Sequence, residues 1–427
     1  MDTYRVRQMK KNSEHIVSVP GSKSITNRAL LLAALANGKS VLKGTLFSDD
    51  SRYFLQSLVD LGFEIETDEK NTAVTVIGLG GKLPKKDGEI YVGSAGTAAR
   101  FLTCMCGLSS GTYIINASEQ MKRRPMKPLM DMLVSIGAEI KFLEEEFHLP
   151  IAITGCGDIQ GRKHIKLDIS ESTQFLSAIL MTSSMLKDGL DIEITSQKKY
   201  GSYIEITLKM MRQFGAEVEF DGSSYHIASN GSYNSITYQI EPDVSAACYF
   251  FAMAAVTASK IKVNNVTKSS MQGDIRFLEV LEQMGCKVIY ESDGVTVEGP
   301  NGKLKGIEIN MNNFSDQTMT LAAIAVFADS VTKISGIGHI RLQETDRLSA
   351  IVNELTRMNI KTEYGEDYIN IYPSMPSPAL IETYDDHRMA MAFTLVGLVA
   401  DGIVIDNPMC CRKTFENYFE IVDEICV

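Results

Sequence analysis

The sequence predicts a mixed α/β protein of two domains, each built from three copies of one repeat. Six times, a short polar or charged cluster directly precedes a strongly apolar segment of helical length. The clusters recur at intervals of roughly 70–77 residues, and a fixed period of this kind indicates a repeat architecture. Five times, an amphipathic segment ends at Gly or Asn and leads at once into an alternation of apolar and polar residues.

The first helix expected in each repeat is apolar on nearly every face. A helix with this pattern has to be buried, because it has no face suited to water. Three parallel buried helices inside three sheets form a plausible domain, so six repeats predict two domains. The six expected helices cover residues 29–36, 98–108, 175–186, 246–258, 319–328 and 389–400.

The second helix expected in each repeat is amphipathic and ends at a residue suited to the left-handed conformation. Gly and Asn adopt this conformation readily at a helix C-terminus. A half-buried strand is expected directly after each helix, because apolar and polar residues alternate there. The residues expected to end these helices are Gly62, Gly137, Gly215, Gly285 and Asn359.

The division between the two domains is expected near Glu241, halfway through the repeats. One domain then holds residues 21–240, and the other holds residues 1–20 together with residues 241–427. The first strand, expected over residues 5–19, precedes the first repeat and can pair in the C-terminal domain. Two chain crossings would then join the domains and form a hinge.

The composition excludes several classes of function. Of the 427 residues, 44% are apolar and 22% are charged, which is ordinary for a globular protein in water. The net charge of −11 argues against a general binder of nucleic acid or anionic membranes, which needs a basic face. The N-terminus lacks the apolar core of a secretory signal, and the longest apolar run, residues 246–256, is too short to span a bilayer. We expect a cytoplasmic protein.

The spacing of cysteines and histidines does not indicate a metal site. None of the eight cysteines belongs to a CxxC pair, and the adjacent Cys410 and Cys411 lack the spacing of a zinc site. The six histidines form no HxH or HExxH pattern. Reduced thiols and the absence of a structural metal are therefore expected.

The six polar clusters lie where the buried helices begin. The first turn of a helix presents unpaired N–H groups and a partial positive charge, so each cluster is a potential anion-binding site. Six such sites in one chain suggest an enzyme that acts on small, multiply charged anions. The clusters span residues 20–24, 93–97, 170–174, 241–245, 313–316 and 384–388.

Residues in and near the first two clusters add chemistry to this pattern. Lys23 and Ser24 open the first helix, with Arg28 one turn inside, although the P-loop pattern is absent. Gly96 permits close approach of the backbone to a ligand. Arg124 ends a short basic run, which is either a solvated charge run or the source of an arginine that grips a carboxylate or phosphate through two hydrogen bonds.

The C-terminal half mixes carboxylates with cations. Neighbouring charges tune the ionisation of a carboxyl group, which suits general acids and bases. Each residue alone is more readily explained as an ion-pair partner, but their common position at the same end of the repeats favours a chemical role. The group comprises Asp316, Glu344, Asp346, Arg347, Asp385, Asp386, His387, Arg388, Arg412, Lys413 and Thr414.

Seven motifs carry a resemblance that runs the whole length of the chain. They are Pro20-Gly21-Ser22-Lys23-Ser24 with Asn27-Arg28, Ala95-Gly96-Thr97-Ala98 with Arg100, Arg124-Pro125, Met271-Gln272-Gly273-Asp274, Glu344-Thr345-Asp346-Arg347, Asp386-His387-Arg388-Met389-Ala390 and Lys413-Thr414-Phe415. Through them the chain resembles the 5-enolpyruvylshikimate-3-phosphate synthase family, also called 3-phosphoshikimate 1-carboxyvinyltransferase. The resemblance implies a two-domain inverse α/β barrel of six βαβαββ repeats, with the active site in the cleft between the domains.

The resemblance also implies an activity and a set of site residues. Such an enzyme transfers the enolpyruvyl group of phosphoenolpyruvate to the 5-hydroxyl of shikimate 3-phosphate and releases phosphate, on the shikimate pathway to chorismate and the aromatic amino acids. The implied contacts to shikimate 3-phosphate are Lys23, Ser24, Arg28, Ser172, Thr173, Gln174, Asp316, His339 and Gln343. Those to phosphoenolpyruvate are Lys23, Gly96, Thr97, Arg124, Gln174, Arg347, Arg388 and Lys413.

The chemistry of this transfer suggests roles for three of these residues. Asp316 is the expected general base, and Glu344 and Lys23 are candidate acids. No metal or other cofactor is expected, because lysines and arginines already neutralise both anions. We expect a monomer that acts on these two small molecules, and the resemblance makes it a target of the inhibitor glyphosate.

Four positions depart from the family pattern. Gln343 stands where Lys is usual, and His339 stands where Asn is common. Tyr200 replaces a common substrate-binding Ser, and Phe101 replaces a Pro that often follows the preceding arginine. These changes affect the expected contacts to the shikimate ring and the response to glyphosate.

Other functions fit part of the pattern. UDP-N-acetylglucosamine enolpyruvyl transferase shares the fold and the donor, but it would carry a reactive Cys near residues 110–125, where this chain has none. A DNA sliding clamp also stacks six βαβ-type units, but its inner helices need a basic face. An RNA-end cyclase would need a nucleotide site, and the sequence shows no motif for one.

Overall fold

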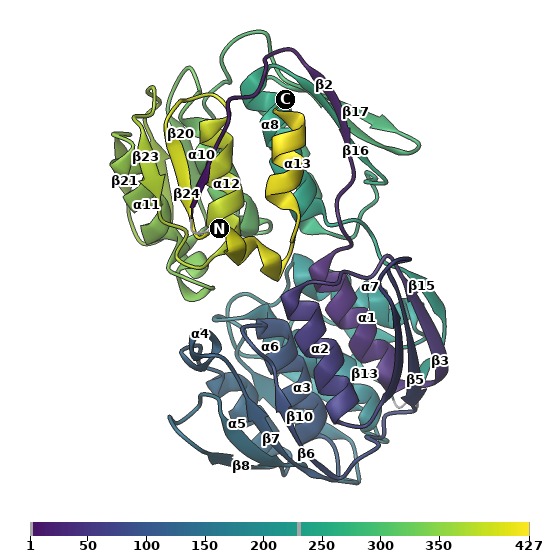
Figure 1. The fold of residues 1–427 in the computed structure, drawn as a ribbon. Helices are drawn as coiled ribbons and strands as arrows, with labels where there is room; N and C mark the ends of the chain where they lie inside the picture. The colour runs from purple at the N-terminus through teal and green to yellow at the C-terminus, as the bar shows by residue number, and fades with distance from the viewer. Residues whose placement is uncertain (1–2, 229–231, 427) are drawn as a thin grey trace. The chain divides into compact units, whose positions relative to one another are not determined.

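The structure, a computed structural model, describes residues 3–228 and 232–426 (Figure 1). The chain divides into two compact units. Unit 1 comprises Met1–Pro20 and Glu241–Val427, and unit 2 comprises Gly21–Ile240. Each unit contains three separate sheets, and none of those formed by the described residues closes into a barrel. The predicted mixed α/β fold is confirmed, with open sheets in place of the continuous wall that the word barrel suggests.

Unit 2 contains three sheets, each with its own helices. The first has β3 (Ala36–Lys43), β4 (Glu64–Asp68), β5 (Ala73–Leu79), β14 (Tyr233–Asn234) and β15 (Thr237–Gln239), with α1 (Lys23–Leu35) and α2 (Asp49–Asp60). The second has β6 (Asp87–Tyr91), β7 (Thr112–Asn116), β8 (Glu139–Phe142) and β9 (Ile151–Thr154), with α3 (Gly96–Gly107), α4 (Glu119–Lys122) and α5 (Lys127–Ser135). The third has β10 (Lys163–Leu167), β11 (Leu190–Ile194), β12 (Val218–Phe220) and β13 (Ser224–Ile227), with α6 (Thr173–Thr182), η1 (Ser183–Met185) and α7 (Ser202–Gln213).

Unit 1 repeats the plan. Its first sheet has β2 (Glu14–Val17), β16 (Lys260–Asn264), β17 (Lys287–Glu291) and β18 (Gly294–Glu298), with α8 (Val244–Thr257), η2 (Gly273–Arg276) and α9 (Phe277–Gln283). The second has β19 (Glu308–Asn310), β20 (Thr332–Ser335), β21 (Thr362–Tyr364) and β22 (Tyr368–Ile371), with η3 (Ser315–Gln317), α10 (Thr318–Ala325), η4 (Gly338–Leu342) and α11 (Arg347–Arg357). The third has β1 (Thr3–Arg5), β23 (Ala379–Ile381) and β24 (Ile403–Asp406), with α12 (His387–Gly397), η5 (Pro408–Lys413) and α13 (Tyr418–Ile425).

The repeat is a βαβαββ unit, which the sheet around β7 shows in full. β6 pairs parallel to β7, and the connection between them is the buried helix α3. After α5, the strands β8 and β9 form an antiparallel pair, and β9 also pairs antiparallel to β7. Parallel neighbours need a long crossover, whereas antiparallel ones need only a short turn, so the order of helices and strands follows from the pairing.

Where the chain passes between the units, two strands pair in a different unit from the helix that follows them in the chain. β2 leads into α1 of unit 2, yet it pairs parallel to β16 of unit 1. β15 leads into α8 of unit 1, yet it pairs parallel to β3 of unit 2. The N-terminal segment pairs in the C-terminal unit as predicted, but it forms two strands, β1 and β2, because a turn at Asn12 (φ 57°) separates them.

The predicted helix ends are confirmed. Gly62, Gly137, Gly215 and Gly285 have φ between 90° and 108°, and Asn359 has φ of 59°. Each lies at the end of an amphipathic helix and just before an edge strand. A side chain with a Cβ is strained in this conformation, which explains the residue types.

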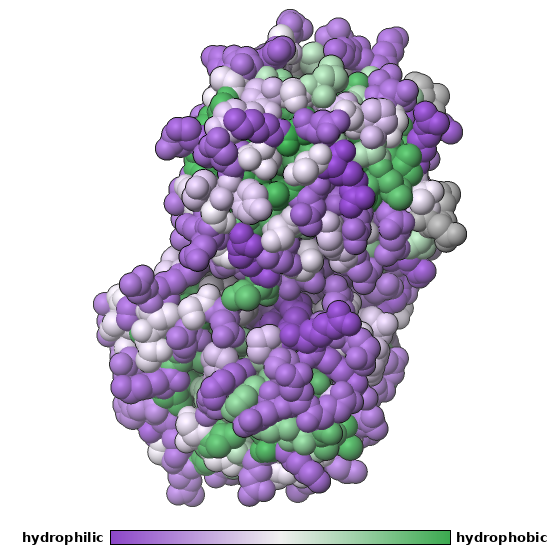
Figure 2. Space-filling view, turned by 90° about the vertical axis from the view of Figure 1, so that its left-hand side faces the viewer, coloured by the Kyte–Doolittle hydropathy of each residue, from purple (hydrophilic) through white to green (hydrophobic). Residues whose placement is uncertain are grey.

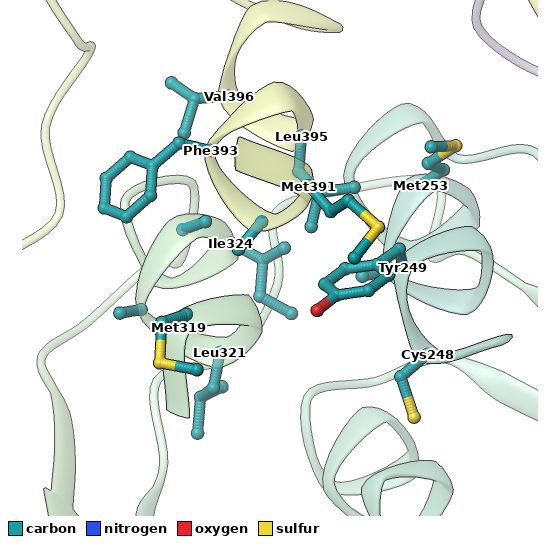
Figure 3. Packing of buried hydrophobic residues seen from close by; sticks show 14 of the residues in the cluster. Cys248, Tyr249, Met253, Met319, Leu321, Ile324, Met391, Phe393, Leu395 and Val396 are labelled. Carbon is teal, nitrogen blue, oxygen red and sulfur yellow. The ribbon is translucent and has the colours of Figure 1, made fainter. Parts of the chain in front are cut away.

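The buried helices form the core of each unit. In unit 1, side chains of α8, α10 and α12 converge, with Tyr249, Ile324 and Met391 among them (Figure 3). These three residues are at most 2% exposed. Burying an aliphatic or aromatic side chain of this size contributes about 1.5–3 kcal/mol, so the packing of the apolar helices stabilises the unit.

The surface differs sharply from this core. The face in Figure 2 is covered mainly by hydrophilic residues, with hydrophobic ones in small separate groups. Within the described residues, no helix is both long and apolar enough to cross a membrane.

Candidate active site

The three buried helices of unit 2 begin next to one another. Asn27 in α1 donates a hydrogen bond to Thr97 in α3 at 2.6 Å, and Arg100 in α3 donates one to Gln174 in α6 at 2.8 Å. None of these helices has an acidic residue in its first turn. Three partial positive charges therefore point into one region, which favours a bound anion.

Arg28 brings a full positive charge into the same helix bundle. It is 1% exposed, and within the described part of the chain it donates only to neutral oxygens, including Thr207 Oγ1 at 2.8 Å, the Ser24 carbonyl at 3.0 Å and Ser177 Oγ at 3.2 Å. Burial lowers the pKa of Arg28 to about 10. The guanidinium remains charged at neutral pH without a carboxylate beside it, so a nearby anion would be strongly stabilised.

Lys23 is held at the start of α1 by a carboxylate of the neighbouring helix. Its Nζ lies 3.3 Å from Oδ2 of Asp50, in the first turn of α2. The Asp50 side chain is only 2% exposed, whereas that of Lys23 is 16% exposed. Asp50 therefore anchors the lysine, whose side chain remains partly accessible.

Gly96 lies under two converging guanidinium groups. A Cβ atom at this position would be 2.6 Å from Nη1 of Arg100 and 2.7 Å from Nη1 of Arg124. Burial lowers the pKa of Arg100, and the positive charge of Arg124 lowers it further. The negative charge of Glu171 opposes this effect, and a bound anion would compensate the two cations further, so this arrangement is suited to a carboxylate or phosphate.

The start of α6 completes this region. Ser172 is the N-cap, and its Oγ accepts a hydrogen bond from the backbone N–H of Gln174 at 3.2 Å. Thr173 is the first residue of the helix. We call Lys23, Ser24, Arg28, Gly96, Thr97, Arg100, Arg124, Ser172, Thr173 and Gln174 the cationic cluster.

Unit 1 contains a second cluster, centred on Asp316. This residue lies in η3, directly before α10, and is 8% exposed. Its Oδ1 accepts a hydrogen bond from Arg347 Nη1 at 3.0 Å, and its Oδ2 accepts one from Arg388 Nη2 at 3.1 Å. The carboxylate is therefore fixed between two cations from two other helices.

Arg347 links Asp316 to a second buried carboxylate. Its Nε donates to Oδ2 of Asp386 at 2.7 Å, and its Nη2 donates to Oδ1 at 3.3 Å. Gln343 accepts a further bond from Arg347 Nη1. Burial alone would lower the pKa of Arg347, but the carboxylates Asp386, Asp316 and Glu344 together raise it. Arg347 is thus permanently charged.

Glu344 lies between two groups that can carry a proton. Lys413 Nζ donates to its Oε2 at 3.0 Å, and His387 Nδ1 lies 3.3 Å from the same atom. Glu344, Asp386 and His387 could supply three metal-ligand atoms within 4.8 Å of one another. Lys413 and the arginine on Asp386 already neutralise both carboxylates, so these residues do not fit a divalent cation well.

The two unusual residues of unit 1 lie beside the same cluster. His339, in η4, contacts Ser315 Oγ through Nε2 at 2.7 Å, and Ser315 directly precedes Asp316. Gln343 reaches the same cluster through its bond to Arg347. We call Asp316, His339, Gln343, Glu344, Arg347, Asp386, His387, Arg388 and Lys413 the acid–base cluster.

The family model for EPSP synthase (3-phosphoshikimate 1-carboxyvinyltransferase) matches residues 7–422. The chain belongs to the EPSP synthase family. A protein of Trichormus variabilis named 3-phosphoshikimate 1-carboxyvinyltransferase is 43% identical over 420 residues, covering 98% of each chain. The chloroplastic protein of that name from Arabidopsis thaliana is 39% identical, covering 96% of this chain and 82% of its own.

Solved structures agree in fold. EPSP synthase from Acinetobacter baumannii has a TM-score of 0.83 at 24% identity, covering 100% of this chain and 98% of its own. The enolpyruvyl transferase NikO from Streptomyces tendae has a TM-score of 0.78 at 14% identity, covering 99% and 97%. At these identities the likeness is one of fold alone. Like its curated relatives, this member of the EPSP synthase family is an enzyme, a transferase.

One expectation about this EPSP synthase family member is wrong in part. The N-termini of α8 and α12 are not open to an external anion, because Asp243 Oδ1 accepts from the N–H of Ala246 at 3.0 Å and Asp386 Oδ1 accepts from the N–H of Arg388 at 2.9 Å. An N-cap carboxylate takes the N–H groups and compensates the dipole that an anion would use. In unit 2, α1 and α3 have no side-chain hydrogen bond at the N-cap, and the cap of α6 is the neutral Ser172.

Asp50 and Asp274 lie beside the site but were not predicted from the sequence. Asp50 is the second residue of α2 and Asp274 is the second residue of η2, so both have the pattern of ordinary N-terminal acidic residues. The available signal was the Met271-Gln272-Gly273-Asp274 motif of the EPSP synthase family.

Tyr200 stacks on Phe220, with ring centroids 6.1 Å apart.

Proposed function

We propose that this chain transfers the carboxyvinyl group of phosphoenolpyruvate to the 5-hydroxyl of shikimate 3-phosphate and releases inorganic phosphate. Family membership supports the reaction class. The observation that carries the proposal is the position of Asp316, a buried carboxylate held by Arg347 and Arg388. A base flanked by cations suits the activation of a hydroxyl group on an anionic acceptor.

The two clusters would divide the work of binding. The cationic cluster supplies Lys23, Arg28 and Arg124 for the phosphate and carboxylate groups. The acid–base cluster supplies Arg347, Arg388 and Lys413 to the donor, and His339 with Gln343 to the acceptor. Each cluster alone lacks half of the groups that the reaction needs, so we propose that residues of both clusters take part in it.

The first step is addition. A proton from Glu344 or Lys23 adds to the methylene carbon of phosphoenolpyruvate, and C2 becomes cationic. The acceptor hydroxyl attacks C2 and forms the new C–O bond, while Asp316 takes the hydroxyl proton. Carboxylates of the acid–base cluster stabilise the positive charge at C2, and fixed groups do so without reorganisation.

The second step is elimination. The bond between C2 and the phosphate oxygen breaks, and the methyl group returns a proton to Glu344 or Lys23, whichever donated it, so that the double bond is restored. The proton held by Asp316 passes to the released phosphate. Lys23 and Lys413 stabilise the leaving phosphate. Glu344, bonded to Lys413 at 3.0 Å and beside His387 at 3.3 Å, is placed to return a proton to its neighbours between turnovers. No metal is required for either step.

The test is phosphate release by the purified full chain with phosphoenolpyruvate and either of two acceptors. We expect release with shikimate 3-phosphate and no release with UDP-N-acetylglucosamine, because the chain has no cysteine between residues 110 and 125. The control is Asp316→Asn, which keeps the shape of the side chain but removes the base. Release with the nucleotide sugar alone, or undiminished release by Asp316→Asn, would contradict the proposal.

A further inference from the structure

Asp274 is a buried carboxyl group beside the acid–base cluster, and the proposed reaction leaves it without a role. It lies in η2, directly before α9, and is 6% exposed. Its Oδ2 accepts hydrogen bonds from Ser245 Oγ and from Gln317 Nε2, the second at 2.8 Å. Ser245 belongs to the first turn of α8, and Gln317 to η3. Three elements of unit 1 therefore meet at this carboxyl group.

These bonds connect Asp274 to both sides of the proposed base. On one side, Gln317 directly follows Asp316 in the chain. On the other side, Arg388 Nη2 lies 3.1 Å from Asp316 Oδ2 and 3.5 Å from Ser245 Oγ. A change at Asp274 therefore reaches Asp316 both through the backbone and through the guanidinium group that holds it.

The orientation of Gln317 is fixed by a separate bond. Its Oε1 accepts a hydrogen bond from Thr320 Oγ1 at 2.9 Å, so its Nε2 is the atom available to Asp274. Gln317 is fully buried. A buried amide with both ends bonded cannot rotate freely, which makes the link from Asp274 to η3 a rigid one.

The charge of Asp274 also acts on Asp316 directly. Burial raises the pKa of Asp274 to about 6, and the negative charge of Asp316 contributes to the rise. Arg388 and the two hydrogen bonds oppose it. The Cys248 thiol donates to the Asp274 carbonyl at 3.5 Å, but burial raises the pKa of Cys248, so the thiol stays neutral. Asp316 and Arg388 are thus the charges that Asp274 faces.

We propose that Asp274 is a positioning residue that orients Arg388 through Ser245 and strengthens Asp316 as a base through its own negative charge. The inference rests on the proposed function, in which Asp316 accepts the hydroxyl proton. Two carboxylates close together in a buried region disfavour double ionisation. Ionised Asp274 therefore promotes proton uptake by Asp316, and protonated Asp274 leaves Asp316 a weaker base between two arginines.

The first test needs no catalysis. The side-chain carboxyl carbon of Asp274 is followed by ¹³C NMR across pH 4–9 in the unliganded full chain, with its signal assigned by its loss in Asp274→Asn. We expect a midpoint near 6, as burial dictates. In Asp316→Asn the midpoint moves down, because the charge that raises it is gone. An unchanged midpoint in Asp316→Asn would overturn the coupling, whatever the substrate of the enzyme.

The second test compares kcat of wild type and Asp274→Asn at each pH. The phosphate groups of the substrates titrate equally in both assays, so they cancel in the ratio. We expect wild type to be faster by about threefold to tenfold at pH 8, since a stronger base accepts the hydroxyl proton more readily. The ratio should fall toward one at pH 5, where Asp274 of wild type is protonated. A ratio that does not change with pH would overturn the proposal.

Two further variants separate charge from structure. Ser245→Ala keeps the Asp274 carboxyl group but removes its link to Arg388. We therefore expect kcat to fall at every pH, while its dependence on pH stays that of wild type. Glu354→Gln is the matched control, since Glu354 is another buried carboxyl group of unit 1 with a raised pKa, and it bonds to Tyr384 and Arg357. Its pH profile should match wild type. If Glu354→Gln loses the same dependence of kcat on pH, that dependence results from general destabilisation, and the role of Asp274 is refuted.

Discussion

Lys23 and Asp50 form an ion pair of 3.3 Å in which the Asp50 side chain is buried and the Lys23 side chain is partly accessible. Asp50 belongs to the amphipathic helix α2, whereas Lys23 begins the buried helix α1. The pair joins the two helices of the first repeat at the end where the proposed substrates bind. It therefore fixes the one cation that the proposed reaction assigns to both substrates.

Replacing Lys23 by Met should abolish turnover and leave the protein folded. The change removes the positive charge that compensates phosphate in both steps, and we expect less than about 2% of the wild-type rate. The measurement is phosphate release together with circular dichroism. Lys39→Met, at an exposed lysine of the same unit, is the control. A Lys23→Met enzyme that retains a tenth or more of the rate, on the order of 1.4 kcal/mol in barrier, would contradict the assignment.

Replacing Gly96 by Ala should weaken the binding of phosphoenolpyruvate. The added Cβ would lie 2.6 Å from Arg100 Nη1 and 2.7 Å from Arg124 Nη1, so both guanidinium groups have to move. We expect KM for phosphoenolpyruvate to rise about tenfold, with a small change in stability. Gly302→Ala is the control, because a Cβ there meets no atom within 4 Å. Equal KM values for the two variants would argue against an anion site at Gly96.

The sequence reveals the repeat more readily than it reveals the pairing between strands. Gly62 and Asn359 could be identified because a left-handed residue leaves a local signature in residue type. The partners and the register of β2 and β15 could not be predicted, since each strand pairs with one that lies about two hundred residues away in the chain or more. Local patterns determine elements, whereas the partner of a strand depends on the whole fold.

The residues of the candidate site also differ in how readily the sequence reveals them. Arg28 stood out because a charged residue within an apolar helix is unusual. Asp274 did not, since an acidic residue at the start of a helix is common and only its burial gives it an unusual environment. The geometry of Asp316 between two arginines likewise depends on contacts among three helices that no local pattern records.

The stability of unit 2 should depend on the protonation of His226. Its ring nitrogens lie 2.8 Å from Asp191 Oδ1 and 3.2 Å from Asp221 Oδ2, and these hydrogen bonds raise the pKa of His226. The protonated form is favoured in the folded state. Its contribution is therefore fully present below the unfolded pKa of about 6.5 and is lost as pH rises through the folded value.

Thermal unfolding of His226→Gln tests this sign. We expect the variant to melt about 1–2 °C below wild type at pH 6, because a partly exposed ion pair contributes little, and the difference should vanish by pH 9. His15→Gln should show the opposite dependence on pH. Burial lowers the pKa of His15, so the folded state favours the neutral ring, and wild type loses stability as pH falls through about 6.5. A His226→Gln deficit that grows with pH would contradict the account.

Substrate binding should make the enzyme more compact. Each cluster carries several cations, and we expect bound anionic substrates to neutralise them and to favour a more compact form. We expect the radius of gyration from solution scattering to fall when shikimate 3-phosphate is added, with shikimate, which keeps the carboxylate but lacks the phosphate, as the control. An unchanged profile at saturating ligand would argue against a hinge at the crossings near Pro20 and Glu241.

³¹P NMR can follow the proposed carboxyvinyl transfer through the phosphorus atoms of both substrates and both products. The purified full chain is incubated with phosphoenolpyruvate and shikimate 3-phosphate, and all phosphorus signals are followed over time. The account predicts that both substrates decline together while inorganic phosphate and one new phosphate monoester appear in equal amounts. Inorganic phosphate without the new ester, or no reaction of either substrate, would contradict it.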